Sequence, residues 1–217
     1  MLKTKAQEEQ LFRLLAAYAI RNDFIGYCQG MNAIGALLLE ILDEEDAFWG
    51  LACVVERILP GYHSRTMAGL HTDQRVLGQL VEQYLPKIAA HLRNMKIDMS
   101  YISTKWFIGI FIHTLPHAIV LRVWDILLTI AYEGTLACRV LFGVALTILS
   151  RVEATILRID DPGAVLQILQ AYDGHLFSPE DEAAFLKDII RFAESLSGDE
   201  VRIEMNAIMI LKMTLLS

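Results

Sequence analysis

The sequence predicts an all-α protein, and three observations lead to that prediction. Of its 217 residues, 54% are hydrophobic, which exceeds the roughly 45–50% apolar content typical of soluble domains. The 13 glycines and 5 prolines are few, which favours packed helices with short connections over a loop-rich β protein. Apolar residues recur at helical spacing, and alternating strand patterns are poor throughout. We therefore expect one multi-helix domain spanning residues 1–217.

Three helices are expected in the N-terminal part of the chain. The first covers residues 5–22, and an apolar second helix runs from Met31 to Leu42 after a break at 23–30. Asp43 is the predicted N-cap of the third helix, because acidic residues follow it in the first turn, where the helix dipole favours negative charge. That helix should end before Pro60.

The remaining helix boundaries are predicted from caps and prolines. Thr72 is the predicted N-cap of the next helix, and Pro86 should kink or split that helix. A buried helical hairpin is expected over 104–130, and residues 135–150, which are nearly all apolar, predict a buried helix. Arg139 is the exception and needs either solvent or a carboxylate partner. The last three helices are expected after Asp161-Pro162, after Ser178-Pro179 and after Ser197-Gly198-Asp199.

Charge and composition exclude several classes of protein. The formal net charge is −7, so binding of duplex nucleic acid or of acidic lipid through a basic patch is not expected. Residues 1–10 are charged and the uncharged run 106–121 contains Pro116, so neither a secretory signal nor a transmembrane segment is expected. We expect a cytoplasmic protein whose three cysteines are buried thiols: Cys28, Cys53 and Cys138.

Metal and nucleotide sites are not expected. His113 and His117 stand four residues apart, as paired ligands do on a helix, but Pro116 lies between them and no third ligand is evident. The sequence contains no glycine-rich phosphate loop, so the chain should not bind nucleotide by itself.

The tryptophans and a nearby charge pair are interpreted as structural. Arg122 and Asp125 are three residues apart beside Trp124 and are expected to form a clamp in the core. Trp49 and Trp106 are expected to lie in the core as well.

The most suggestive segment is Tyr27-Cys28-Gln29-Gly30-Met31-Asn32, between the first two helices. Gly26 and Gly30 flank Gln29, whose amide is both donor and acceptor and can orient a water molecule without titrating. A rigid turn held by the following helix would let this side chain project outward. The alternative is that Gln29 only caps a helix or satisfies buried backbone groups, and residue chemistry alone leaves both open.

This hexapeptide resembles the glutamine-finger motif of the TBC domain of Rab GTPase-activating proteins. Later segments resemble further signatures of the family in the same order, and the resemblance is strongest over residues 10–150. These segments are Asp46-Ala47-Phe48-Trp49, Asp73-Gln74-Arg75-Val76, Leu85-Pro86-Lys87, Ser103-Thr104-Lys105-Trp106-Phe107 and Leu121-Arg122-Val123-Trp124-Asp125.

The resemblance implies an all-helical domain that is not itself an enzyme and activates a Rab-type small GTPase in trans. In this family an arginine neutralises charge on the transferred phosphoryl group, which is worth about 10³–10⁵ in rate, and a glutamine positions the attacking water. Carried over, Gln29 is the water-positioning residue, and Tyr27, Gly26, Gly30 and Asn32 bind the partner. GTP and magnesium would belong to the partner, so no cofactor is expected. The resemblance also implies vesicle trafficking, with membrane association only through the partner at endomembranes.

The sequence departs from the family at the arginine. The family's arginine lies in an Ile-x-x-Asp-x-x-Arg motif well upstream of the glutamine, whereas here Ile20-Arg21-Asn22-Asp23 is followed by Gly26 in the arginine position. Neither Arg13 nor Arg21 fits the motif. We therefore expect a domain truncated at its N-terminus, with its arginine encoded upstream, and a chain that is inactive alone. The alternatives are a GTPase-binding or scaffold domain without activation, and an unrelated helical interaction domain.

Overall fold

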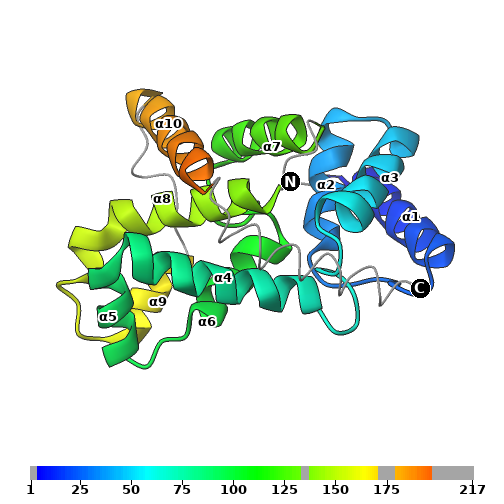
Figure 1. Ribbon diagram of the computed structural model, residues 1–217. Helices are drawn as coiled ribbons and strands as arrows, with labels where there is room; N and C mark the ends of the chain where they lie inside the picture. The colour runs from blue at the N-terminus through cyan, green and yellow to red at the C-terminus, as the bar shows by residue number, and fades with distance from the viewer. Residues whose placement is uncertain (1–3, 133–136, 171–178, 197–217) are drawn as a thin grey trace.

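The chain folds into α-helices joined by short loops, as Figure 1 shows. The computed structural model describes residues 4–132, 137–170 and 179–196, and these residues contain no strand, which confirms the all-α prediction. The helices are α1 (Lys5–Arg21), α2 (Met31–Ile41), α3 (Glu44–Cys53), the π-helix η1 (Val54–Ile58), α4 (Ala68–Tyr84), α5 (Pro86–Asn94), α6 (Met99–Ile108), α7 (His117–Tyr132), α8 (Cys138–Ile156), α9 (Pro162–Gln170) and α10 (Pro179–Ser195).

Helices α4–α10 form the larger group of helices in the molecule, and α8 lies at its centre. It contacts α4, α5, α6, α7, α9 and α10, and all residues from Val140 to Leu149 are buried. This burial confirms the expectation of a buried helix. Gly143 lets α10 pack closely, because a Cβ at that position would lie 2.7 Å from the carbonyl oxygen of Ile189.

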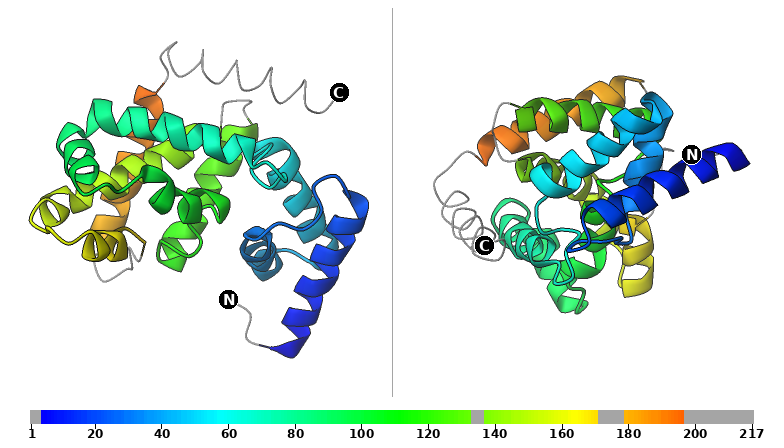
Figure 2. Two further views of the ribbon diagram at one scale, coloured as in Figure 1. Left: turned by 90° about the horizontal axis from the view of Figure 1, so that it is seen from below. Right: turned by 90° about the vertical axis from the view of Figure 1, so that its right-hand side faces the viewer.

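Helices α1, α2 and α3 pack on one another and form one end of the molecule (Figures 1 and 2). Leu14 and Tyr18 on the inner face of α1 are buried, whereas Phe12 and Ile20 on its outer face are 73% and 83% exposed. Helix α1 therefore lies at the edge of the molecule, as the left-hand view of Figure 2 shows. The turn that joins α1 to α2 starts from this edge.

Local sequence signals located most of the helix boundaries. Asp43 and Asp161 each accept a backbone N–H three residues on, at 3.0 and 2.8 Å, and Pro86 opens α5 where α4 has ended. The prediction for Thr72 was wrong, because α4 begins at Ala68 and the hydroxyl of Thr72 donates to the carbonyl of Ala68 inside that helix, at 2.8 Å. The cap expected at Ser178 and the helix expected after residue 199 lie outside the described residues.

The expectation that all three cysteines are buried was wrong for two of them. Cys138 is buried, Cys28 is half-buried and Cys53 is exposed. Cys53 lies in an apolar stretch of sequence but on the outward side of α3, and an amphipathic helix buries only one of its sides.

The core placement of Trp49 and of the Arg122–Asp125 pair was also wrong. Trp106 and Trp124 are buried, but Trp49 is 52% exposed. Arg122 and Asp125 do form an ion pair of 3.2 Å, with side chains that are 63% and 66% exposed. Spacing of three residues on a helix brings two side chains together wherever that face points, so it carries no information on burial.

No helix in the described ranges is both long enough and apolar enough to cross a membrane.

Candidate functional site

Residues 22–30, here called the Gln29 turn, connect α1 to α2 and contain two glycines with positive φ. Gly26 has φ +67° and Gly30, the N-cap of α2, has φ +105°. Side-chain-bearing residues rarely adopt these angles, so both positions require or strongly favour glycine. Gly30 is followed by Met31, the first residue of α2, so Gln29 lies directly before the N-cap of that helix.

The Gln29 side chain is exposed, and its amide makes no hydrogen bond to any residue in the described part of the chain. The N-terminus of α2 carries no side-chain cap. The amide is therefore available to an external molecule, and the geometry favours the outward orientation over a capping role.

The start of the Gln29 turn is anchored by a single carboxylate, Glu56 of η1. Its Oε1 accepts from the Tyr18 hydroxyl at 3.3 Å, from Arg21 at 2.6 Å and from the Asn22 amide at 2.9 Å. Burial alone would raise the pKa of Glu56, but the hydrogen bonds from Asn22 and Arg21 outweigh it and lower the pKa below its ordinary value. Glu56 is therefore held as an anion between α1 and the turn.

Local hydrogen bonds fix the backbone within the turn. The side-chain Oδ1 atom of Asn22 accepts a hydrogen bond from the N–H of Ile25 at 3.2 Å, and the backbone carbonyl of Asn22 accepts one from the N–H of Gly26 at 2.8 Å. Further on, the Oδ1 atom of Asn32 accepts the N–H of Gly30 at 3.2 Å. Asn32 is exposed, and one of its side-chain atoms thus serves the turn itself.

The end of the turn closes against the C-terminus of α6. A Cβ atom on Gly30 would lie 2.9 Å from the carbonyl oxygen of Ile108, a separation that real Cβ atoms do not show. Gly30 is buried, in contrast to the exposed Gln29 beside it. The turn therefore presents one exposed amide between two fastened ends.

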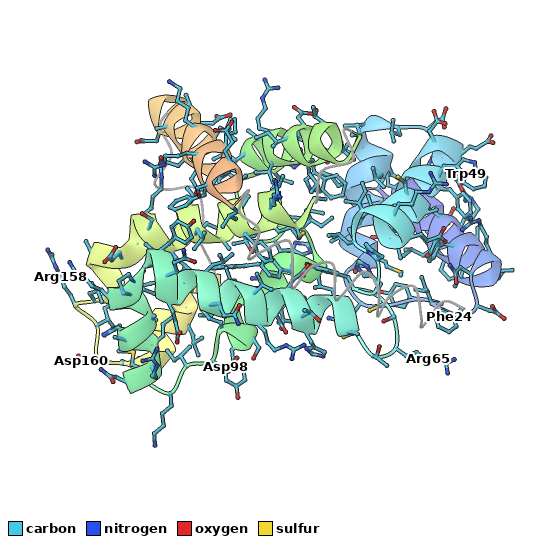
Figure 3. All side chains as sticks on the ribbon, viewed as in Figure 1. Phe24, Trp49, Arg65, Asp98, Arg158 and Asp160 are labelled. Atoms are coloured by element: carbon cyan, nitrogen blue, oxygen red, sulfur yellow. The ribbon has the colours of Figure 1, made fainter. Side chains whose placement is uncertain are left out.

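Apolar side chains surround the turn on the outside. Ile20, Phe24 and Tyr27 are 83%, 61% and 55% exposed, so the expected partner-binding residue Tyr27 is accessible. Phe24 and Trp49 both lie at the α1–α3 end of the molecule in Figure 3. Exposed apolar groups near a polar anchor are typical of protein–protein contact surfaces.

The two arginines nearest the turn on α1 are engaged in structural contacts. The Nε and Nη2 atoms of Arg13 donate to the two carboxylate oxygens of Glu44, each at 2.7 Å. Arg21 pairs with Glu56 and also lies over the Trp49 ring, with 5.3 Å from its guanidinium carbon to the ring centroid. This stacking explains why Trp49 remains partly exposed although it is large and apolar.

Other chemistries find little support near the turn. Burial raises the pKa of the Cys28 thiol, which disfavours the thiolate that a nucleophile needs. His117 lies 3.1 Å from Glu40, but no group of three or more His, Cys, Asp or Glu side chains arranged for a metal ion occurs within the described residues.

Sequence reasoning located the turn but missed the residues that hold it. Glu56 is 34 residues from Asn22 in sequence, and Ile108 contributes a backbone carbonyl, which carries no side-chain signal. The only sequence clue was the need for glycine at position 30, which indicates a close approach without naming its partner.

A family model described as the Rab-GTPase-TBC domain matches residues 1–157. The chain therefore belongs to the Rab-GTPase-TBC domain family, which confirms the resemblance drawn from the sequence motifs.

Curated relatives are longer than this chain. TBC1 domain family member 2A of Rattus norvegicus is 43% identical over 171 residues, which cover 78% of this chain and 18% of the relative. Growth hormone-regulated TBC protein 1 of Xenopus laevis is 44% identical over 151 residues, which cover 69% of this chain and 42% of the relative. The chain thus spans less than half the length of these relatives.

Two solved structures share the fold. The Ypt/Rab-GAP domain of Gyp1p superposes with a TM-score of 0.79 at 18% identity, covering 89% of this chain and 68% of that domain. The Chlamydomonas flagellar RabGAP TBC domain superposes with a TM-score of 0.71 at 32% identity, covering 86% of this chain and 60% of that one.

Proposed function

We propose that this chain is a GTPase-activating domain for a Rab-type small GTPase, and that Gln29 orients the attacking water in the nucleotide site of the partner. The exposed, unbonded amide of Gln29 between two anchored ends is the observation that supports this proposal most strongly. Membership of the Rab-GTPase-TBC family supports the class of partner. On this proposal the protein acts in the cytoplasm and reaches endomembranes only through its partner.

The proposed chemistry needs position more than reactivity. Water attacks the γ-phosphorus of GTP, and GDP and inorganic phosphate leave, so no covalent bond to this chain forms. The side-chain carbonyl oxygen of Gln29 can accept a hydrogen bond from the water while the side-chain amide nitrogen donates to a phosphate oxygen. The turn is already fixed when the chain folds, so less conformational entropy is lost when the complex with the GTPase forms. GTP and magnesium come with the partner GTPase, and this chain contributes no cofactor.

The arginine that the family pairs with glutamine is not assigned to Arg13 or Arg21, because their ion pairs with Glu44 and Glu56 hold them in place. This observation favours a second candidate function, a GTPase-binding domain that does not accelerate hydrolysis. The two functions predict the same partner and differ only in the rate of GTP cleavage.

Single-turnover GTP hydrolysis by a panel of Rab GTPases tests the first function. The Gln29→Ala variant should reduce the acceleration by roughly 10²-fold, the scale expected when a positioning group is lost at a phosphoryl-transfer site. Gln167→Ala removes an equally exposed glutamine on α9, at the opposite end of the molecule, and should leave the rate unchanged. If the unaltered chain accelerates hydrolysis, an equal acceleration by Gln29→Ala would remove Gln29 from the mechanism.

Binding to GDP-loaded Rab in the presence of aluminium fluoride, which mimics the transferred phosphoryl group, separates the two functions. Binding of such a complex without acceleration of hydrolysis would support the binding domain. Failure to bind any Rab, whether GTP-bound or GDP-bound with aluminium fluoride, would overturn both candidate functions.

A further inference from the structure

His63 is a buried histidine in the loop between η1 and α4 that the proposed mechanism does not use. Only 1% of its surface is exposed, its Nε2 atom lies 3.3 Å from the carbonyl oxygen of Ile108, and its Nδ1 atom is buried without a hydrogen-bond partner. A carbonyl oxygen can only accept, so Nε2 carries the proton. Burial lowers the pKa of His63 to about 4, which keeps the ring neutral at neutral pH.

The Ile108 carbonyl is available to His63 because α6 ends abruptly at this residue. Ile110 and Phe111 have φ values of +48° and +59°, in the left-handed region that side-chain-bearing residues rarely adopt. The N–H of Ile112 consequently donates to Gly109 at 3.0 Å instead of continuing the helical pattern to Ile108. Backbone strain of this kind persists only where surrounding contacts fix it, and it is common at functional sites.

The same carbonyl oxygen forms the surface against which Gly30 closes. The separation of 2.9 Å from a Cβ built on Gly30 leaves room for a hydrogen atom alone. Ile108 therefore contacts His63 on one side and the residue that follows Gln29 on the other. A shift of this carbonyl toward Gly30 would therefore displace the N-terminus of α2, beside which Gln29 lies.

The loop that carries His63 is itself fixed to α4. The hydroxyl of Tyr62 donates to the Asp73 carboxylate, and both side chains are buried. Gly69 allows the loop to lie against the helix, because a Cβ at this position would lie 2.5 Å from the carbonyl oxygen of Pro60. His63 thus projects from a rigid base on the larger group of helices.

We propose that His63 is a positioning residue for Gln29, acting through its hydrogen bond to the Ile108 carbonyl. The inference rests on the proposed function for its catalytic consequence, but its structural part stands on the contacts among His63, Ile108 and Gly30. His63 touches neither the GTPase nor the nucleotide in this scheme. Its hydrogen bond fixes the position of the Ile108 carbonyl, and the contact of that carbonyl with Gly30 fixes the position of Gln29.

Two substitutions separate the hydrogen bond from the volume of the side chain. His63→Gln places an amide N–H close to the position of Nε2 and keeps one unpaired acceptor, as the histidine does. His63→Leu fills similar space and removes the donor. If His63→Leu does not fold, as judged by circular dichroism, His63→Met replaces it as a more adaptable donor-free variant.

Hydrogen exchange in the free 217-residue chain tests the structural part without any GTPase. The reporters are the N–H groups of Met31, Ala33 and Ile34, which bond to the carbonyls of Cys28 and Gly30 at 3.1–3.3 Å. Exchange over residues 26–34 should be faster in His63→Leu than in His63→Gln by roughly tenfold, while peptides from α3 stay unchanged. Equal exchange over 26–34 in the two variants would overturn the positioning role.

Steady-state GTP hydrolysis by the Rab partner tests the catalytic part. His63→Leu should lower kcat by roughly 10–10²-fold with KM nearly unchanged, because displacement of a positioning group by about 1 Å acts on the chemical step. His63→Gln should restore most of kcat. Faster exchange with an unaltered kcat would overturn the link to catalysis, whereas a chain that activates no Rab at all refutes the proposed function and leaves the exchange result to decide the role of His63 in the turn.

Discussion

The amide nitrogen of Asn22 donates to Oε1 of Glu56 across 2.9 Å, and this bond joins the first residue of the Gln29 turn to η1. The same oxygen receives the hydroxyl of Tyr18 and the guanidinium of Arg21, both from the last turn of α1. One carboxylate thereby fixes the direction in which the chain leaves α1. Positioning of the glutamine begins at this junction.

Glu56→Ala should lower the free energy of unfolding by about 2–3 kcal/mol, because three donors lose their acceptor and the Tyr18 ring that carries one of them is fully buried. Glu56→Gln retains an acceptor oxygen and should cost about half as much. Urea denaturation measures both. Glu82→Ala is the control, since it breaks an ion pair with Arg93 whose side chains are 61% and 66% exposed and should change stability by less than about 1 kcal/mol. Equal losses in the free energy of unfolding for Glu56→Ala and Glu82→Ala would show that the hydrogen bonds to Glu56 stabilise the fold no more than an exposed ion pair does.

Alanine substitutions at the two glycines of the turn should have different costs. At Gly26, with φ +67° and no atom within 4 Å of a built Cβ, only backbone strain opposes alanine, and the loss should be about 1 kcal/mol. At Gly30, where φ is +105°, backbone strain adds to a collision with Ile108, and the loss should exceed about 2 kcal/mol. Thermal denaturation measures the order. Gly26→Asn, which tolerates the left-handed region, should be milder than Gly26→Ala; a reversed order between positions 26 and 30 would contradict the close contact.

His63 should make the protein less stable at acidic pH. The folded protein binds a proton there only near a pKa of about 4, whereas the unfolded chain binds one near 6.5. The unfolded state therefore holds more protons between these values, and the free energy of unfolding should fall as pH drops through this window, by at most about 3 kcal/mol. Carboxylates titrate in the same range, so the measurement is the difference between the unaltered chain and His63→Gln, followed by denaturation from about pH 7 to pH 4. A difference that stays constant over this range would show that the ring titrates normally.

The three thiols should react with a thiol reagent in the order of their exposure. Cys53 is exposed and should react first in the folded protein, whereas burial protects Cys138 and raises the pKa of Cys28. Reaction with a chromogenic disulfide under native conditions should therefore titrate one rapid thiol per chain. Cys53→Ser should abolish the rapid phase, and rapid loss of two or more thiols in the folded chain would contradict the placement of Cys28 and Cys138.

Features set by local chemistry were predictable from the sequence. The caps at Asp43 and Asp161 and the break at Pro86 depend on residues within one helical turn, and all three were confirmed. Thr72 failed because the start of α4 is set by tertiary contact. The preceding Met67 adopts φ +48° without capping the helix, and Gly69 packs against Pro60.

The exposure of individual side chains and the residues that hold the Gln29 turn could not be predicted in this way. Trp49 is large and apolar, as core residues are, but it is 52% exposed, and the guanidinium that lies over its ring comes from Arg21 on another helix. The role of His63 depends on a carbonyl 45 residues away, and a backbone atom leaves no mark in a sequence motif. The turn around Gln29 could be located because its motif is contiguous, whereas the residues that fasten it come from α1, η1 and the C-terminus of α6.

The two ends of the Gln29 turn are fastened by bonds of different character, and they respond to different conditions. The Arg21–Glu56 pair is charged, with side chains 40% and 26% exposed, so added salt screens it. The bond between His63 and Ile108 is neutral and enclosed, and ionic strength leaves it almost unaffected. Added salt should therefore weaken the attachment of the turn on the side of α1, where only the uncharged donors Asn22 and Tyr18 remain unaffected, more than its attachment on the side of α2.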